Sequence, residues 1–266
     1  MNEGAIELSA LDVGLAALLV LVAGAVSLAL RLRLEGRLAI ASLRTVAQLL
    51  LVGYILRWVF DLQSPLLIAA VVAVMLVAAS FAAVRRPSRA YPGVTVRALV
   101  TLVLTGILTV YIVTGLIIDA QPWYRPQYLI PLLGMILGNS LTGISLALDT
   151  LLESLHGRWQ EVETDLALGA TRWEAATPPL RDAVRRGMIP IINTMMVVGI
   201  VSLPGMMTGQ ILEGADPLKA VSYQIVVMFM LAASTAMGSI GVGLLTCLRL
   251  FNHRHQLVAR DVRMRE

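Results

Sequence analysis

Residues 65–84 read PLLIAAVVAVMLVAASFAAV, a run of twenty residues without a charged side chain. A helix of about 20 apolar residues is long enough to cross the hydrocarbon layer of a bilayer, so this run predicts a transmembrane helix. Further apolar stretches of spanning length occur on both sides of it. Together they predict about seven spans: 11–30, 38–60, 65–84, 96–118, 128–150, 188–210 and 221–248.

The composition of the whole chain also indicates a membrane protein. Of its 266 residues, 58% are hydrophobic and 14% are charged, whereas a soluble domain carries about 25% charged residues. This composition excludes a soluble enzyme, a nucleic-acid-binding module and a disordered tail. The apolar runs are continuous rather than alternating, which argues against a β-barrel. We therefore expect an all-α polytopic membrane protein in which residues 1–266 form one transmembrane domain.

The basic residues between the predicted spans predict the orientation. Of the 21 lysines and arginines, 17 lie in four connections on one side: 31–37, 85–97, 153–187 and 249–266. Two lie in the connections on the other side: 61–64, 119–127 and 213–220. Because basic loops stay in the cytoplasm, we expect the N-terminus outside and the C-terminus inside. These loops also account for the net charge of +4, so the charge implies the lipid bilayer and no nucleic acid as a partner.

Two polar residues, Arg44 and Gln48, lie within the second predicted span. They are one helical turn apart and share a face of the helix. An ionised side chain inside a membrane is costly and by default marks a functional site. Snorkelling to the interface or binding to a neighbouring helix is the alternative for Arg44. We count both residues as candidates for a translocation pathway.

The sixth predicted span ends in SLPGMMTGQ, residues 202–210. Pro204 cannot donate a backbone hydrogen bond, so it is expected to kink the helix, and Gly205 adds pliability. A kink at membrane depth is tolerated mainly where protein or a cavity satisfies the backbone, so this stretch is a candidate pathway wall. Including polar residues of neighbouring spans, the candidates are Asn139, Ser202, Pro204, Gly205, Met206, Met207, Gln210 and Gln224.

The methionines and glycines of these spans have a structural interpretation as well. Met195, Met196, Met206, Met207, Met228 and Met230 could coordinate a soft metal ion, or they could be flexible packing in a moving bundle. Iron would prefer oxygen ligands, so the metal ligands stay unknown. Gly134-x3-Gly138 and Gly205-x3-Gly209 predict close helix packing.

The longest polar stretch is the segment 153–187. Residues 159–168 predict a short amphipathic helix with Trp159, Val162 and Leu166 on one face. Gly169 fits the C′ position that follows it, and Thr171 to Glu174 form a capping box that begins a second helix. Pro178 and Pro179 are expected to interrupt this helix. The segment is either a shape for a partner to grip or an ordinary surface loop.

This segment resembles the cytoplasmic coupling loop of ABC-transporter permeases, which carries Glu-Ala-Ala, three residues and then Gly. Glu163 and Gly169 match that pattern, while Thr164 and Asp165 depart from the two alanines. Nearly the whole chain is similar to the FetB-type family of ABC permeases, bacterial iron exporters related to plant aluminium-tolerance proteins. The similarity rests on RTVAQLLLVGYIL (44–56), PLLGMILGNSLTG (131–143), LALGATRWEA (166–175) and VGIVSLPGMMTGQILEGADPLKAVSYQIVVMFML (198–231).

The resemblance implies a permease of the bacterial inner membrane that exports iron together with a separate ATPase subunit, with two copies of each subunit. The residues that would couple to the ATPase are Glu163, Leu168, Gly169, Ala170, Thr171 and Trp173. The chain itself has no P-loop, which needs Gly-Lys-Ser/Thr, because its only lysine is Lys219 and Leu218 precedes it. We therefore expect no catalytic residue and no cofactor in this chain, with ATP and Mg²⁺ bound by the partner.

The substrate stays open at this stage. The three histidines, His156, His253 and His255, fall in cytoplasmic segments, and Cys247 is the only cysteine, so a deep His/Cys metal site is not available. The plant relatives have been linked to a nucleotide sugar, so another substrate or another metal is one alternative. An ion-driven secondary transporter is a second alternative, but it needs ionisable residues at depth, and the candidates are only Arg44 and, near the inner end of its span, Asp149. The direction of transport is not fixed by the sequence.

Overall fold

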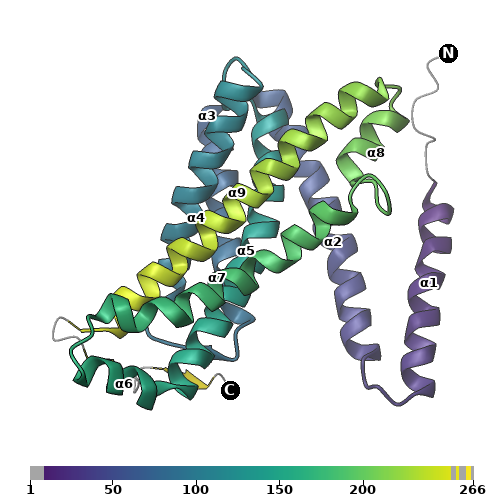
Figure 1. Cartoon of the computed structure of the whole chain (residues 1–266). Helices are drawn as coiled ribbons and strands as arrows, with labels where there is room; N and C mark the ends of the chain where they lie inside the picture. The colour runs from purple at the N-terminus through teal and green to yellow at the C-terminus, as the bar shows by residue number, and fades with distance from the viewer. Residues whose placement is uncertain (1–8, 253–255, 258–261, 265–266) are drawn as a thin grey trace.

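The computed structural model describes residues 9–252, 256–257 and 262–264, and these residues are almost entirely helical (Figure 1). The helices are α1 (Ala10–Ala29), α2 (Glu35–Leu62), α3 (Pro65–Arg85), α4 (Val94–Tyr111), α5 (Pro126–Gly157), α6 (Trp159–Ala167), α7 (Arg172–Val197), α8 (Gly205–Leu212) and α9 (Pro217–Leu250). A π-helical turn, η1 (Ile112–Ile117), continues α4. The strands β1 (Arg89–Ala90) and β2 (Arg263–Met264) pair antiparallel. The predicted all-α class is confirmed.

Among the described residues, six helical stretches are long and apolar enough to cross a membrane: Leu11–Ala29, Glu35–Leu62, Pro65–Arg85, Val94–Ile117, Pro126–Gly157 and Pro217–Leu250. The seventh expected span, 188–210, is wrong as a continuous helix. The helix α7 begins far earlier, at Arg172, and ends at Val197, and α8 begins only at Gly205. Pro204 has no N–H and forces the residue before it into extended backbone, so the break is deeper than the expected kink.

The helix α7 continues through the two prolines that were expected to interrupt it. Pro178, Pro179 and Pro190 all lie inside α7. Proline has a φ that suits a helix, and its costs are the missing N–H and the crowding of the carbonyl four residues earlier. The hydroxyl of Thr177 donates to the carbonyl of Trp173 at 2.6 Å just before the pair. Packing on both sides, with Pro179 and Ala183 buried, holds the helix together.

The body of the molecule consists of α3, α4, α5, α7 and α9, with α5 and α9 at its centre (Figure 1). The tightest crossing brings α5, α7 and α9 together at Gly143, Gly187 and Ser239. A methyl group on Gly187 would lie 2.7 Å from the Ser239 hydroxyl and 2.8 Å from the carbonyl oxygen of Gly143. Small residues let membrane helices approach closely, and here they do so at three helices at once.

The hairpin of α1 and α2 stands beside this body (Figure 1). Its apolar side chains are exposed along most of both helices, and α2 joins the core near its end through Val59. The connection between the helices is closed by Ser27, whose hydroxyl donates to Glu35 and accepts from the Leu34 N–H, both at 3.0 Å. Exposed apolar faces of this length suit lipid or a second protein chain.

Candidate functional site

The glycine turn between α6 and α7 is closed by a full set of local hydrogen bonds. Gly169 has a φ of +100°, which favours glycine. Its N–H donates to the carbonyl of Leu166 at 3.1 Å, and the N–H of Ala170 donates to the carbonyl of Asp165 at 3.0 Å. These two bonds are the Schellman arrangement that ends a helix. The predicted C′ role of Gly169 is confirmed.

The capping box at the start of α7 is confirmed as well. The Glu174 N–H donates to the Thr171 hydroxyl at 3.3 Å, and the Thr171 N–H donates to the Glu174 carboxylate at 2.7 Å. Two hydrogen bonds lower the pKa of the Glu174 carboxyl. The bond from the Thr171 backbone has the larger effect, and the bond from the Thr171 side chain has the smaller one. α6 and α7 therefore meet at a turn whose backbone groups are satisfied from both sides.

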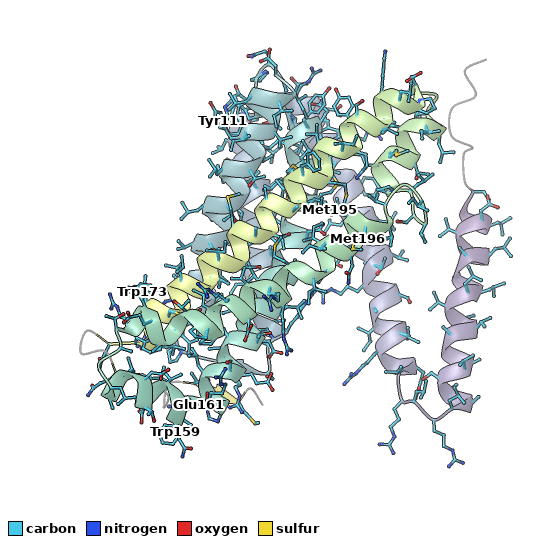
Figure 2. All side chains as sticks on the ribbon, in the orientation of Figure 1. Tyr111, Trp159, Glu161, Trp173, Met195 and Met196 are labelled. Atoms are coloured by element: carbon cyan, nitrogen blue, oxygen red, sulfur yellow. The ribbon has the colours of Figure 1, made fainter. Side chains whose placement is uncertain are left out.

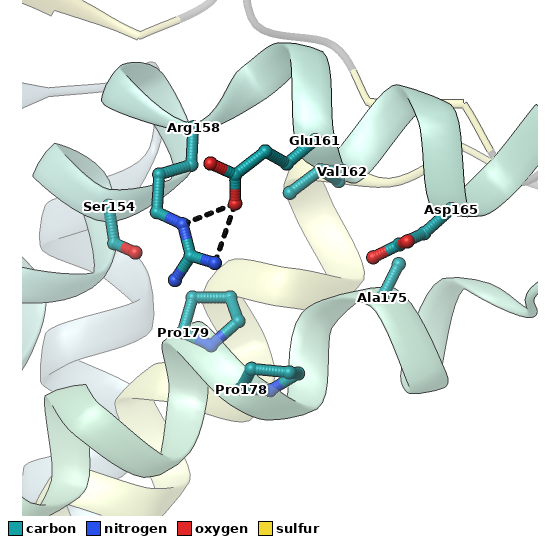
Figure 3. Close-up of a pocket in the computed structure, with 8 residues that line it drawn as sticks. All are labelled: Ser154, Arg158, Glu161, Val162, Asp165, Ala175, Pro178 and Pro179. Carbon is teal, nitrogen blue, oxygen red and sulfur yellow. Dashed lines mark hydrogen bonds and ion pairs between the residues drawn. The ribbon is translucent and has the colours of Figure 1, made fainter.

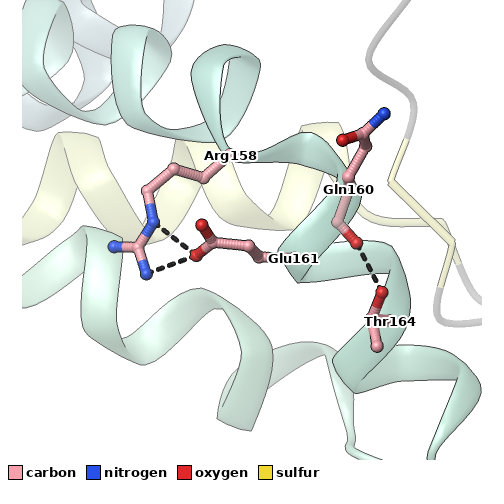
Figure 4. Close-up of polar contacts among 4 residues, drawn as sticks. All are labelled: Arg158, Gln160, Glu161 and Thr164. Atoms are coloured by element: carbon pink, nitrogen blue, oxygen red, sulfur yellow. Dashed lines mark hydrogen bonds and ion pairs between the residues drawn. The ribbon is translucent and has the colours of Figure 1, made fainter.

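Two polar contacts at α6 involve exposed residues (Figure 4). The Arg158 Nε donates to Glu161 at 2.7 Å, and the pair also forms an ion pair. The Thr164 hydroxyl donates to the carbonyl of Gln160 at 2.8 Å. The hydrogen bond to Glu161 raises the pKa of Arg158. An exposed pair of this kind contributes little to stability.

A shallow crevice separates α6 from α7 (Figure 3). It has a volume of about 30 Å³ and is lined by Ser154, Arg158, Glu161, Val162, Asp165, Ala175, Pro178 and Pro179. Val162 and Ala175 are buried, so they fasten α6 onto α7. Leu166 is half-buried, but Trp159 is exposed, so of the three residues predicted to share a face of α6 only Val162 and Leu166 are covered.

The six predicted coupling residues gather around the turn. Leu168 is 83% exposed, and Glu163, Gly169, Thr171 and Trp173 are exposed as well, while Ala170 is half-buried. The neighbouring charged residues are of both signs: Glu161, Asp165 and Glu174 are acidic, and Arg158 and Arg172 are basic. We call Glu163, Leu168, Gly169, Ala170, Thr171 and Trp173 the turn surface.

The other end of α7 is irregular. Residues 198–204 leave the helix, Gly199 takes a φ of +84°, and its N–H donates to the carbonyl of Ser202 at 2.9 Å. Ile200 and Val201 are 89% and 79% exposed. Ser202 is exposed, Pro204 is half-buried at the N-cap position of α8, and Gly205 opens that helix. We call 198–204 the break.

A groove lies between the end of α7, the break, α8 and α9. Its volume is about 540 Å³, and it is lined by Met195, Val198, Gly199, Leu203, Met207, Val221, Gln224, Ile225, Met228 and Phe229. Of the predicted pathway residues, Met207 and Gln224 line it. Met196, the neighbour of Met195, is exposed and is not part of the lining (Figure 2).

The other predicted pathway residues lie apart from this groove. Arg44 and Gln48 are exposed on α2, and Met206 is half-buried on α8. Gln210 is half-buried, and its Oε1 has no hydrogen-bond partner in the described part of the chain. Asn139 is half-buried on α5 and its Nδ2 donates to the carbonyl of Met135 at 3.1 Å. These residues lie on three different helices, α2, α5 and α8, and none of them lines the groove.

Sequence reasoning missed most of the α9 side of the groove. Val221, Ile225 and Phe229 line it beside Gln224 and Met228. The spacing of Val221, Gln224, Ile225 and Met228 places them on one helical face, so periodicity was the signal that could have found them. No group of three or more His, Cys, Asp or Glu that could hold a metal ion occurs within residues 9–252, 256–257 and 262–264. His253 and His255 lie outside the described residues.

Comparisons with known proteins agree over nearly the full chain. The sequence pattern of the uncharacterised protein family UPF0014 matches residues 10–251. The UPF0014 membrane protein slr1647 of Synechocystis is 39% identical over 97% of this chain and 100% of its own length. The Escherichia coli protein named "Probable iron export permease protein FetB" is 32% identical, over 95% of this chain and 96% of its own. The Arabidopsis thaliana protein ALUMINUM SENSITIVE 3 is 32% identical, over 91% and 87%. No solved structure matches the chain significantly.

Proposed function

This chain belongs to the UPF0014 family of multi-pass membrane proteins, and on that premise we propose that it is the permease subunit of an ATP-driven transporter. A separate ABC ATPase subunit would bind ATP and Mg²⁺ and dock on the turn surface. The chain would then need no cofactor of its own. Iron, exported from the cytoplasm, is the proposed substrate because a relative that matches nearly end to end bears the name of an iron export permease.

The observation that carries this proposal is the continuity of α7. The helix runs without interruption from the turn surface to the break, 26 residues that cover about 39 Å. A partner that shifts the turn surface would move α6 and α7 as one piece, because Val162 and Ala175 are buried between them. The far end of α7 lines the groove through Met195. Docking in the cytoplasm is thereby linked to a groove beside α9.

The break also supports an assembly of two permease copies. It lies beside residues 221–229 of α9, within a helix long and apolar enough to span the membrane. Irregular backbone is not stable against lipid, and is found at membrane depth only where protein or a water-filled cavity covers it. A second copy, with a pathway between the two, would cover Ile200 and Val201. A second copy would also shield Arg44, which is exposed on α2 and would be costly against lipid.

The basic loops support a proposal for the cellular placement. We propose a bacterial inner membrane, with the N-terminus outside and the turn surface in the cytoplasm, because the connections that contain most of the arginines include 153–187. Two alternatives keep a supporting observation. An ABC permease for a nucleotide sugar or another metal would use the same turn surface. An ion-driven secondary transporter would rest on Arg44 and would leave the turn surface without a task.

Reconstitution tests the proposal. The chain is co-expressed with a candidate ABC ATPase, purified, and placed in proteoliposomes loaded with Fe²⁺ or Fe³⁺. We expect a stable complex and an ATP-dependent movement of iron that stops when ATP is replaced by a non-hydrolysable analogue. Failure of any ABC ATPase encoded in the same genome to bind the chain would overturn the proposed mechanism. Binding and ATP turnover without iron movement would overturn the substrate alone.

A further inference from the structure

We infer that the end of the bundle opposite α6 binds the headgroup of a zwitterionic phospholipid, one whose phosphate is followed by a primary ammonium group. The site is a pocket of about 310 Å³ between the α2–α3 turn and the segment that leads into α5. We call it the loop pocket, and its polar side chains are those of Gln63, Gln121, Tyr124 and Arg125. This inference goes beyond the proposed transport function and leaves iron as the proposed substrate.

The loop pocket lies where the long apolar helices end. Helices α2 and α3 meet at residues 62–65, and α5 begins at Pro126 and runs 32 residues toward α6 (Figure 1). Aromatic side chains gather at the interface between hydrocarbon and water. Here Trp123 makes edge-to-face contacts with Tyr111 and Tyr124, with ring centroids 5.3 and 5.9 Å apart. The pocket is therefore placed to meet lipid headgroups rather than hydrocarbon.

The donors of the lining match a phosphate group. Arg125 is the only charged residue among the described residues that line the pocket, and none of their carboxylates lies within ion-pairing distance of its guanidinium. A guanidinium binds phosphate through two parallel hydrogen bonds. The Tyr124 hydroxyl and the Gln63 amide can donate further ones. Helices α3 and α5 also begin here without a side-chain cap, and the positive end of a helix favours a phosphate.

The charges around the pocket favour a zwitterionic headgroup over an anionic one. The Asp119 carboxylate accepts a hydrogen bond at 3.0 Å from Gln121, which lines the pocket, so a negative charge lies at its rim. Residues 57–68 and 119–126 contain two arginines and two aspartates, Arg57, Asp61, Asp119 and Arg125, whose charges balance. A phosphate on Arg125 and an ammonium on Asp119 would satisfy both side chains. A headgroup with only a negative charge would be repelled by Asp119.

Apolar surface beside the pocket provides a place for the acyl chains. Ile68, Pro122 and Pro126 form the apolar part of the lining. Leu62, at the end of α2, is 54% exposed, and Leu66, in the first turn of α3, is 81% exposed. A free phosphate compound would contact only the polar side chains, whereas a phospholipid would contact both surfaces. This continuity assigns the pocket to a lipid rather than to a dissolved molecule.

The test measures lipid binding to the purified full chain by native mass spectrometry. Phosphatidylethanolamine, phosphatidylglycerol and phosphatidylcholine with identical acyl chains are each titrated onto the delipidated protein. We expect saturable binding of phosphatidylethanolamine that is about fivefold tighter than binding of the other two. The reason is that phosphatidylglycerol has no ammonium group, and the ammonium of phosphatidylcholine has no N–H to donate to Asp119.

Two arginine variants locate the binding. Arg125→Gln should weaken the binding of phosphatidylethanolamine about tenfold, equivalent to about 1.4 kcal/mol. Arg57→Gln removes the same charge from a residue outside the lining, so it is the matched control and should bind as the unaltered chain does. Arg125 bonds the first turn of α5 through its backbone carbonyl, not its side chain, so Arg125→Gln should keep the fold. Equal weakening by both substitutions would show a general effect of charge and would overturn the inference.

Asp119→Asn tests the selectivity for the headgroup. Asparagine tolerates the φ of +53° at this position, and the variant should bind phosphatidylethanolamine and phosphatidylglycerol equally. In the unaltered chain, equal binding of all three lipids would mean unselective contact, and tighter binding of phosphatidylglycerol would mean a site for anionic lipid. Displacement of the lipid by an equal concentration of water-soluble glycerophosphoethanolamine would mean a site for a dissolved molecule. Each of these results would overturn the inference. The assay contains neither ATPase nor iron, so its failure is separate from a failure of the proposed transport function.

Discussion

The chain makes a sharp turn at each end of α7, and the two turns are stabilised in different ways. Each has a glycine with positive φ, Gly169 at +100° before the helix and Gly199 at +84° after it. The first turn is closed by two Schellman bonds and a capping box, so its backbone groups are satisfied. The break is closed by backbone bonds alone, from Gly199 to Ser202 and from Ile200 and Val201 back to Val197, and the side chains of Ile200 and Val201 stay exposed.

This contrast indicates a division of labour along one helix. The turn surface presents a fixed shape, which suits a partner that must recognise it and push against it. The break has few contacts of its own, so small shifts of α7 should change its conformation at little cost. With a rigid turn surface at one end and an easily deformed break at the other, α7 could convert docking of a partner into movement of the groove wall.

A substitution at the crossing of α5, α7 and α9 should have the largest effect on stability, because this crossing holds the middle of α7 in place. Gly187→Ala would place a methyl group 2.8 Å from the Gly143 carbonyl oxygen, and we expect a loss of about 1–3 kcal/mol in the free energy of unfolding. Unfolding can be followed with a thiol-reactive dye, because Cys247 is the only cysteine and is 2% exposed.

Gly138→Ala on α5 is the matched control for that experiment. A methyl group there would meet no atom of a neighbouring element within 4 Å in the described structure. The dye should report the same transition temperature for this variant as for the unaltered chain. Equal destabilisation by both substitutions would show that the crossing is looser than the distances indicate, and that it does not hold α7 in place.

The same substitution at both ends of α7 tests the division of labour directly. A valine at positive φ is strained by about 1–3 kcal/mol, and neither Gly169 nor Gly199 has an atom of a neighbouring element near its added Cβ. Gly169→Val should weaken co-purification of the partner ATPase with the permease. Gly199→Val should leave the ATPase bound but reduce ATP-dependent transport in proteoliposomes. Membrane insertion should survive in both, and interchanged results would reverse our assignment of the two ends.

Local chemistry made the turn surface predictable from the sequence. Gly169 and the Thr171–Glu174 box obey rules that involve only neighbouring residues, so the structure confirms both. The class of fold was equally accessible, because hydrophobicity identifies all six long apolar helices, although it also predicted a seventh span at 188–210 that the structure breaks. The roles of the turn-surface and pathway residues in transport stay predictions, since they concern partners and solutes.

The errors have different physical causes: at 198–204 the local effect of Pro204 was larger than the expected kink, whereas within α7 tertiary packing overrode a local rule. Pro178 and Pro179 stay helical because α7 is fastened between α5 and α9, which no local pattern reveals. Gly205 and Gly209 have the spacing for close packing, yet no neighbouring element approaches them in the described structure. The close approach occurs at Gly143 and Gly187, which lie on different helices and have no mutual spacing in sequence.

Leu168 should matter to the partner and not to the fold. Its side chain is 83% exposed, so Leu168→Ala should leave the unfolding transition within about 0.5 kcal/mol of the unaltered chain. An exposed leucine at the tip of a rigid turn is well placed to fill an apolar pocket on the ATPase, and we expect weaker binding by about 1–2 kcal/mol. Surface plasmon resonance of the ATPase on immobilised permease measures this. Leu203→Ala, at the break, is the control and should not change ATPase binding.

The smallest effect concerns pH and only one end of α7. The hydrogen bonds from Thr171 lower the pKa of Glu174, so the capping box is stabilised at neutral pH and loses this stabilisation as the pH falls through the lowered pKa. Hydrogen exchange at residues 168–176, corrected for the intrinsic rate, should be constant from pH 7 to about 5 and then lose protection. Glu174→Gln should remove this pH dependence. Residues 198–204 contain no titratable side chain, so the break should show no such step, and a step there would mean that the two ends are coupled through α7 itself.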